Sequence, residues 1–374
     1  MKTGDKFEKN RKKRPAKDRI VANPGVRTKR SKKGGEGFLR RHALAVMAVC
    51  IFFMVFCVGI LWFCISGYKG KSDVYIEVTE TMSSDNLRDS LKKNLGGATG
   101  QRVYILWKLQ GGNMKASEGL YRIVPGQSAF MAARIIAKGR RTPVRVTFNN
   151  VRTVDDLSRI ISARMRFSAA DFRKAVAKVL AEKGFKPEEF PAAFMPDTYE
   201  FYPDASPEKV IRKMYDARIK FWNEERMSKA DKLGMTPVQV ATLASIVEEE
   251  SYRIPERPTI AGLYLNRLRK KMRLQADPTV KFAIGNPNLR RISTDMLKVE
   301  SPYNTYRING LPPGPIRIPN GKTIDAVLDA PHHSYLYMCA KSNFSGYHDF
   351  AETYEEHRKN AARYQAELDK RDIH

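Results

Sequence analysis

Cysteine and histidine are scarce in this chain of 374 residues, which has four cysteines and six histidines. Cys50, Cys57 and Cys64 share one apolar run at seven-residue spacing, where they read as small apolar side chains. Cys339 is the single cysteine beyond that run, so the rest of the chain can form no internal disulfide. The thinly spread histidines form no metal-ligand motif. We therefore expect neither a metal nor a cofactor.

Acidic residues are also few, with 40 Asp and Glu against 67 Lys and Arg, a net charge of +27. Residues 1–41 hold 16 Lys and Arg against 4 Asp and Glu, or +12, which leaves +15 for the remainder. This basic stretch lacks apolar periodicity, so we expect a disordered tail over residues 1–42. A nucleic-acid arm could have this composition, but the position of the tail argues against nucleic-acid binding.

A long uncharged run, Ala43 to Ile65, follows the basic tail directly. Its 23 residues exceed the roughly 20 that cross a hydrocarbon core, and a cleaved signal peptide would have a shorter apolar region. Trp62 suits an interfacial anchor near the far end. We therefore predict a single-pass membrane helix over residues 43–66. Because Lys and Arg are concentrated before the run, we expect the tail to lie in the cytoplasm and the remainder of the chain outside it.

Short alternating elements are predicted between the membrane run and Phe148. Asp73–Val78, Val103–Trp107 and Gly119–Val124 have strand-like composition, and a helix is expected between the first two. A Pro125-Gly126 turn is then followed by a helix from Ser128 to Lys138. The residues by themselves allow a plain α+β packing unit.

The helix that organises the rest of the chain begins at Thr236-Pro237, a capping threonine followed by proline at the first helical position. Three consecutive glutamates end it, and a helical wheel points them in different directions. Glu249 points away from the apolar stripe, so we expect it to be solvated, whereas Glu248 borders the stripe. Glu250 lies against Ile246 and Val247 in the last turn, where burial and the helix dipole both favour the protonated carboxyl. The three glutamates could equally form a charged helix end without a chemical role.

Several ordered blocks around this helix resemble those of the YceG-like (MltG) endolytic murein transglycosylases. The blocks are Ile246–Ser251, Asn266–Val280, Ser301–Ile316 and Ser334–Ala340. The resemblance is dense from Met195 to His348, weaker from about Ser117, and absent from the first seventy residues. Several blocks in a fixed order are more specific than one short motif.

The resemblance implies an α+β protein with a single N-terminal transmembrane helix, a small LysM-like α+β subdomain over residues 67–142 and a larger mixed α+β catalytic domain over residues 143–374. The segment Tyr121–Gly139 is similar to the strand, PG turn and short helix of LysM, a module that holds glycan strands. The implied partners are peptidoglycan glycan strands and the membrane, and a peptidoglycan synthase or the division machinery is a candidate. The implied place is the inner (cytoplasmic) membrane, with the catalytic domain in the periplasm.

The resemblance also implies the chemistry, in which one carboxyl acts as both acid and base and the substrate supplies its own nucleophile. Glu250 falls on the catalytic glutamate of the family, and Glu248 on the first acid of its ExE pair. The implied reaction cleaves the bond between N-acetylmuramic acid and N-acetylglucosamine and leaves a 1,6-anhydro end. Its implied role is the termination of glycan strands and the remodelling of the wall. Motif positions implied to line the groove, together with Glu248, are Asn266, Arg267, Gln275, Asp277, Thr279, Tyr303, Asn304, Tyr306 and His348.

Two departures and two other classes of function remain. In the family the PPGPI block usually continues with Asn-Pro-Gly, whereas here it continues with Arg317-Ile318-Pro319-Asn320-Gly321, and Met338-Cys339 stands where the family usually has Phe-Val. Arg267 and Asp277 could instead form a structural ion pair. A non-catalytic wall anchor would share the basic exterior and the LysM-like segment. A lysozyme-like hydrolase would need a second carboxylate, for which Asp277 is the best candidate.

Overall fold

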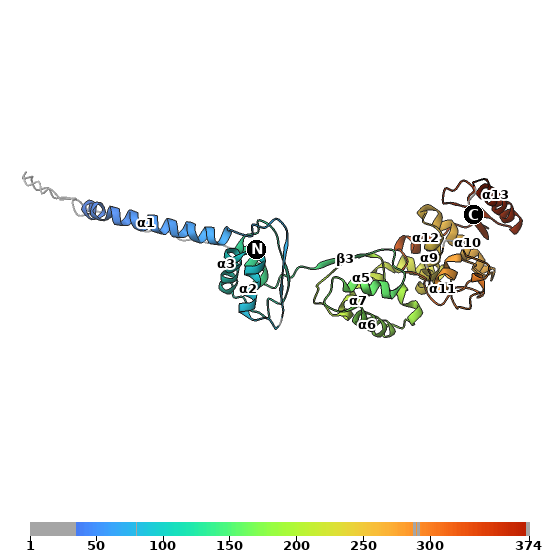
Figure 1. The fold of residues 1–374 in the computed structure, drawn as a ribbon, viewed down its shortest axis with the longest axis horizontal. Helices are drawn as coiled ribbons and strands as arrows, with labels where there is room; N and C mark the ends of the chain where they lie inside the picture. The colour runs from blue at the N-terminus through green and yellow to red at the C-terminus, as the bar shows by residue number, and fades with distance from the viewer. Residues whose placement is uncertain (1–34, 80, 287–288, 290–291, 372–374) are drawn as a thin grey trace, which may run out of the picture. The chain divides into compact units, whose positions relative to one another are not determined.

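The computed structural model describes residues 35–79, 81–286, 289 and 292–371, with side chains from His42 onward. The chain forms two compact units that divide between Phe63 and Cys64, and each is considered by itself. The first contains all but the last two residues of α1 (Gly35–Ile65), which begins before the predicted boundary at residue 43. Within α1, His42–Ile65 is long and apolar enough to cross a membrane, judged by length and composition (Figure 1). The tail predicted to be disordered lies, over residues 1–34, outside the described residues.

The second unit opens with β1 (Val74–Val78), α2 (Ser84–Leu95), α3 (Gly97–Leu109) and β2 (Gly119–Ile123). The two strands pair antiparallel, and α4 (Ala129–Ala137) follows with Ser128 as its cap. The strand predicted over Val103–Trp107 is wrong, because these residues lie inside α3. Their β-branched and aromatic content suggested a strand, but the apolar side chains instead form the buried face that α3 packs against α2 and α4.

A second small core surrounds the antiparallel pair β3 (Val144–Phe148) and β4 (Asp197–Phe201). Their apolar side chains pack with those of α5 (Val154–Ser162), α6 (Ala169–Ala181) and α7 (Pro207–Phe221). The short 3₁₀ segment η1 (Pro187–Ala193) leads into β4. The core extends to Ile318, which belongs to a much later part of the chain. The packing of Ile318 therefore holds the segment after residue 310 against this core.

The largest core is built around α9 (Pro237–Glu250), which α8 (Glu224–Lys232) precedes. As predicted, Thr236 caps α9, Pro237 is its first residue and the apolar stripe is buried. The helix packs against α10 (Arg257–Arg269), α11 (Asp277–Ile284) and α12 (Gly321–Leu328), as Figure 1 shows. Helical packing on several sides therefore holds the end of α9, and with it Glu250, in one position.

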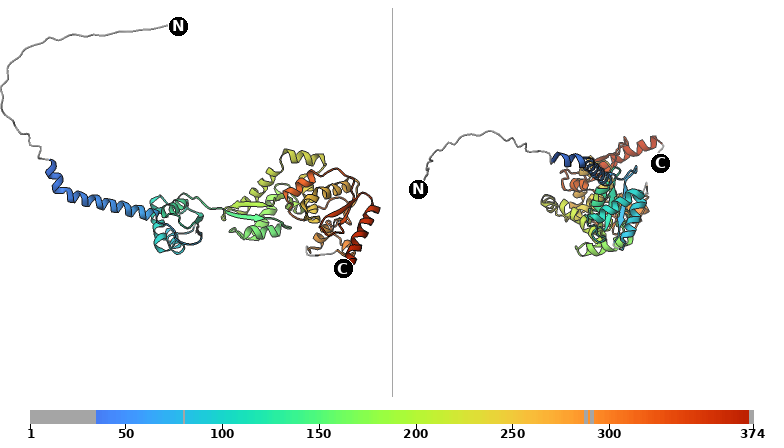
Figure 2. Two further views of the ribbon diagram at one scale, coloured as in Figure 1. Left: turned by 90° about the horizontal axis from the view of Figure 1, so that it is seen from above. Right: turned by 90° about the vertical axis from the view of Figure 1, so that its left-hand side faces the viewer.

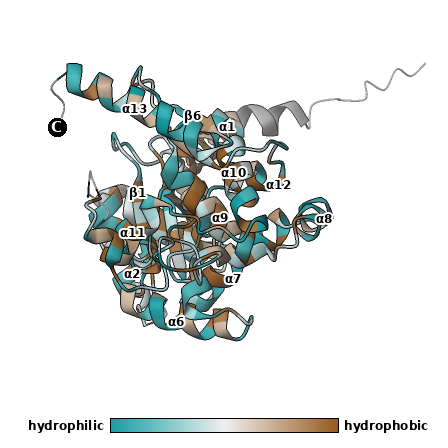
Figure 3. Ribbon diagram, turned by 90° about the vertical axis from the view of Figure 1, so that its right-hand side faces the viewer, coloured by the Kyte–Doolittle hydropathy of each residue, from teal (hydrophilic) through white to brown (hydrophobic). Residues whose placement is uncertain are grey.

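Short 3₁₀ segments and a last hairpin complete the fold. The segments are η2 (Ile254–Glu256) and η3 (Met296–Lys298), and the hairpin pairs β5 (Tyr337–Ala340) with β6 (His348–Ala351). The final helix, α13 (Tyr354–Lys370), packs on both strands and is drawn in red in Figure 2. Hydrophilic residues predominate on α13 (Figure 3). The described chain is thus a mixture of helices and short strands, in agreement with the expected α+β class.

Candidate functional site

A cavity of about 210 Å³ lies where the end of α9 meets α10, the start of α11 and the last hairpin. Glu250, the expected catalytic residue, meets there with five of the residues expected to line a groove: Arg267, Gln275, Asp277, Tyr306 and His348. Six further residues complete the lining: Leu263, Tyr264, Leu274, Met338, Cys339 and Ala340. The lining therefore combines the end of α9, one face of α10, the turn before α11, Tyr306 and the last hairpin, which are distant in sequence and are brought together by packing around α9.

Glu250 is the last residue of α9 and is half-buried against the helical core. Burial raises its pKa to about 7, the hydrogen bond from Tyr264 opposes this rise, and the negative charge of Asp277 adds to it. The Tyr264 hydroxyl donates to Glu250 Oε1 over 2.5 Å. A carboxyl with a pKa near neutrality can give up a proton and take one back in the same reaction cycle.

Tyr264 is the partner of Glu250 that sequence reasoning missed. It lies within α10 and is buried, as its place in the apolar stripe of that helix indicates. Burial raises the pKa of its phenol well above the ordinary value, so the group stays protonated and remains a donor to Glu250. The available signal was general: a tyrosine within an apolar stripe needs a partner for its hydroxyl, and such a partner is often functional.

The two carboxyls of the cavity differ in their surroundings. The Tyr306 hydroxyl donates to Asp277 Oδ1 over 2.6 Å, and burial raises the pKa of Tyr306. Asp277 begins α11, where the helix dipole favours a negative charge, whereas Glu250 ends α9, where the dipole disfavours one. The two carboxyls thus stand at opposite ends of their helices, and of the two it is Glu250 that lies where burial and the helix dipole both favour the protonated form.

Arg267 and Gln275 shape the turn that carries Asp277. Arg267 donates through Nε to the Leu336 carbonyl over 2.6 Å and through Nη1 to the Leu274 carbonyl over 2.7 Å. These main-chain bonds, rather than an ion pair with Asp277, hold the buried guanidinium. Gln275 has a φ of 50°, a left-handed conformation that is uncommon for a residue with a side chain. The strained turn places its side chain at the cavity.

His348 reaches the cavity from the first position of β6. Its Nδ1 lies 2.8 Å from Glu256 Oε2, and its backbone N–H donates to Glu256 Oε1 over 2.6 Å. The Ser251 hydroxyl, just beyond Glu250, donates to the same carboxylate over 3.1 Å. The buried Glu256 thus connects the end of α9 with the hairpin and fixes the orientation of the imidazole.

Four of the expected groove residues lie outside the cavity lining, in its supporting structure. Asn266 donates to the carbonyls of His333 and Tyr335, and Asn304 donates to those of Leu297 and Val299. The hydroxyl of Thr279 donates to the Ala276 carbonyl, and Tyr303 packs on Phe282. Side chains of this kind hold loops in place and can be conspicuous in a sequence without contacting a ligand.

Glu248 and Glu249 also turn away from the cavity. Glu248 accepts from the backbone N–H of Asn320 over 2.9 Å and from the hydroxyl of Thr323 over 2.7 Å, at the start of α12. The expectation that Glu249 is solvated is wrong. Its side chain is 15% exposed and pairs with Arg152 and, over 2.8 Å, with Arg317.

Arg317 stands where the sequence departs from the family pattern, and its side chain is 8% exposed. It pairs with Glu248 over 3.2 Å as well as with Glu249, so one guanidinium is shared between the two acids that precede Glu250. The helical wheel could not reveal this arrangement, because Arg152 and Arg317 both come from segments that are remote in sequence from α9. Arg317 therefore has a structural role at the C-terminal end of α9.

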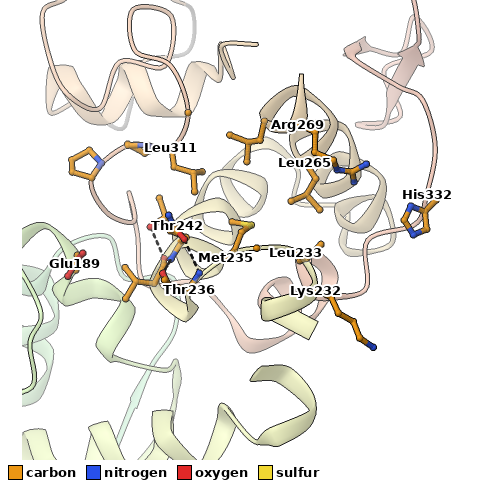
Figure 4. A pocket seen from close by; sticks show the side chains of 17 residues that line it. Glu189, Lys232, Leu233, Met235, Thr236, Thr242, Leu265, Arg269, Leu311 and His332 are labelled. Atoms are coloured by element: carbon orange, nitrogen blue, oxygen red, sulfur yellow. Dashed lines mark hydrogen bonds between the residues drawn. The ribbon is translucent and has the colours of Figure 1, made fainter. Parts of the chain in front are cut away.

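A larger cavity of about 860 Å³ lies beside the first half of α9 (Figure 4). Leu233, Met235, Leu265 and Leu311 give it a largely apolar wall. Thr236, which also faces it, is engaged in the capping box of α9. The smaller cavity is the better candidate for chemistry, because it holds the carboxyl with the raised pKa. Within residues 42–79, 81–286, 289 and 292–371, no group of three or more His, Cys, Asp or Glu residues is arranged to hold a metal ion.

The chain belongs to the YceG-like family, whose family model matches residues 76–363. The endolytic murein transglycosylase of Bacillus subtilis (strain 168) is 39% identical over 170 residues, or 45% of this chain and 46% of that protein. The endolytic murein transglycosylase of Streptococcus pneumoniae serotype 2 is 30% identical over 173 residues, or 45% of this chain and 31% of that protein. The matched region thus spans less than half the length of these curated relatives.

A solved structure extends the likeness to the fold. The crystal structure of a yceG-like protein from Listeria monocytogenes has a TM-score of 0.51 and 27% sequence identity, and the match covers 78% of this chain and 99% of that one. Most of the chain therefore has a counterpart in the fold of that protein.

Proposed function

We propose that this protein is an endolytic peptidoglycan transglycosylase, a lyase that cleaves the bond between N-acetylmuramic acid and N-acetylglucosamine within glycan strands. The observation that carries the proposal is Glu250, a half-buried carboxyl with its pKa raised to about 7, in a cavity lined by polar side chains. The two relatives named above, both endolytic murein transglycosylases, support the reaction class. Cleavage of nascent strands would end their growth and remodel the wall.

In the proposed reaction Glu250 first donates its proton to the glycosidic oxygen as the bond breaks. The resulting carboxylate then accepts the proton of the muramoyl C6 hydroxyl while that oxygen closes on C1. The product is a 1,6-anhydro end, and no water is added. The Tyr264 hydroxyl stabilises the carboxylate between the two steps, which keeps its pKa near neutrality rather than higher.

The substrate contacts are assigned to the polar side chains of the cavity: Arg267, Gln275, Asp277, Tyr306 and His348. Amide, phenol and imidazole groups provide the hydrogen bonds that sugar hydroxyls and N-acetyl groups need. The supporting residues act through the walls of the cavity, and these are Glu248, Asn266, Thr279, Tyr303 and Asn304.

The membrane arrangement is part of the proposal. A single-pass anchor within α1, with its basic flank in the cytoplasm, would place residues 66–374 outside the inner membrane, beside the wall. Protease added to spheroplasts should then digest residues 72–374 and spare the tail. A protected C-terminal part would contradict this orientation.

A LysM-like role is proposed for residues 67–142. The segment Tyr121–Gly139 motivates it, and the basic exterior suits a wall that carries carboxylates. Deleting residues 72–142 from a membrane-free protein should weaken its binding to purified sacculi more than it alters the cleavage products. Unchanged sacculus binding by a folded truncation would contradict the role.

Two other functions predict different products. A lysozyme-like hydrolase remains a second candidate because Asp277 lies in the same cavity as Glu250 and would serve as the second carboxylate. It would yield reducing ends instead of anhydro ends, and a non-catalytic wall anchor would yield no cleavage. Mass spectrometry of peptidoglycan digested with the full chain separates these three outcomes. Reducing ends would overturn the transglycosylase proposal.

A further inference from the structure

An exposed aromatic side chain stands beside the candidate cavity. Tyr252 follows Glu250 by two residues and is 71% exposed, among the most exposed aromatic side chains of the region beyond α1. The Arg253 guanidinium lies 4.9 Å from the centre of its ring and 5.3 Å from the centre of the Tyr347 ring. Tyr347 directly precedes the cavity residue His348. We refer to Tyr252, Arg253 and Tyr347 together as the aromatic platform.

The aromatic platform is held in place before any ligand arrives. Arg253 donates to the Ser345 carbonyl over 2.7 Å through Nη2 and over 3.2 Å through Nε. Its backbone N–H donates to the Ser251 hydroxyl oxygen over 3.1 Å. Gly346 has a φ of 77°, and a side-chain carbon there would collide with the Tyr252 hydroxyl. Because these contacts already order the side chains, a ligand that stacks on them loses little additional entropy.

The position of the aromatic platform connects it with the cavity from two directions. Two residues of extended chain reach at most about 7 Å, so the backbone of Tyr252 lies close to that of Glu250. Tyr347 joins the cavity through His348, which Glu256 and Ser251 connect back to the end of α9. A chain-like ligand that extends out of the cavity can therefore reach the platform without a break.

We propose that the aromatic platform is a further glycan subsite, which binds a pyranose ring of the strand outside the bond that is cleaved. A pyranose presents an apolar face of C–H groups that stacks on an aromatic ring, and its hydroxyl and N-acetyl edge is suited to the N–H groups of an arginine. This inference rests on the proposed function for the identity of the ligand, but it concerns binding rather than the chemical step.

The first experiment measures binding of peptide-free glycan strands, purified from peptidoglycan, to the full chain in detergent. The Glu250→Gln background keeps the strands intact. Tyr252→Ala should weaken binding by roughly 3- to 10-fold, the range expected for loss of one aromatic stacking partner. Tyr252→Phe should bind as well as the parent, since the ring face remains. Tyr202→Ala, which removes another tyrosine that is 47% exposed, is the matched control and should have no effect.

The second experiment uses the chain with Glu250 intact and follows strand cleavage. Tyr252→Ala should raise KM by the same factor and leave kcat nearly unchanged, because the ring acts on ground state and transition state alike. Binding by Tyr252→Ala that equals binding by Tyr202→Ala would overturn the subsite, whatever products the parent forms. If the parent yields no anhydro ends while Tyr252→Ala still weakens binding, the proposed function fails and the subsite stands.

Discussion

Replacing Tyr264 with phenylalanine removes one hydroxyl from the candidate site and leaves the ring that packs in α10. That hydroxyl donates to Glu250 Oε1 over 2.5 Å and so stabilises the carboxylate more than the carboxylic acid. Its removal should therefore raise the pKa of Glu250 above its present value of about 7. Hydrogen bonds to charged groups contribute about 1.5–3 kcal/mol, and one pKa unit corresponds to 1.36 kcal/mol, so the rise should be about 1–2 units.

The assay is the pH dependence of kcat/KM for strand cleavage. In the proposed reaction Glu250 must be protonated at the start, so activity should fall as the pH rises through its pKa. In Tyr264→Phe this alkaline limb should move from about 7 to about 8–9, and the rate at the optimum should fall because Glu250 becomes a weaker acid and gives up its proton less readily in the first step.

A matched control is Tyr199→Phe, which removes a buried hydroxyl that donates to the Met195 carbonyl in the other core. It should lower stability and leave the pH profile unchanged. An alkaline limb that stays in place in Tyr264→Phe, or moves to lower pH, would refute the reasoning that connects this hydroxyl with the pKa of Glu250.

Four further predictions concern the acids and the thiol around the site. Glu250→Gln should lose at least about 10²-fold in cleavage, yet be more stable than the parent at pH 8. Because the pKa of Glu250 is raised in the folded protein, the stability that its protonated form contributes is lost as the pH rises from 4.5 to about 7, by at most about 3 kcal/mol. Thermal unfolding of both proteins at pH 4 and pH 8 would measure this difference. Glu249→Gln should not be silent: it leaves Arg317 with a weaker partner and should cost about 1–3 kcal/mol in urea unfolding, with anhydro products retained. Asp277→Asn should lower the pKa of Glu250 and shift the alkaline limb of cleavage downwards; loss of activity as complete as in Glu250→Gln, with reducing ends from the parent, would indicate a hydrolase. Alkylation of Cys339 by a bulky maleimide should block cleavage, whereas Cys339→Val should keep its activity after the same treatment, since its remaining thiols lie in α1; cleavage by protein labelled at Cys339 would argue against the cavity as the site.

Local sequence information was sufficient for the elements whose form depends on neighbours along the chain. The start of α9 at Thr236-Pro237, its buried stripe and the caps of several helices follow from short-range hydrogen bonding and from helical periodicity. The apolar run within α1 likewise follows from composition. The raised pKa of Glu250 could be expected as well, because its position against Ile246 and Val247 reports burial without any knowledge of its partners.

Partners that are distant in sequence were decided only by the tertiary structure. Tyr264 bonds to Glu250 across 14 positions, whereas Arg152 and Arg317 reach Glu249 across 97 and 68 positions. Periodicity places a residue on a face of a helix, but what covers that face depends on how separate elements pack. The helical wheel therefore predicts a solvated Glu249 although Arg152 and Arg317 cover it, and composition predicts a strand over Val103–Trp107 although packing against α2 and α4 stabilises a helix. The tendency of a residue to be buried can be inferred from its own segment, whereas its interaction partner is determined only when separate segments pack together.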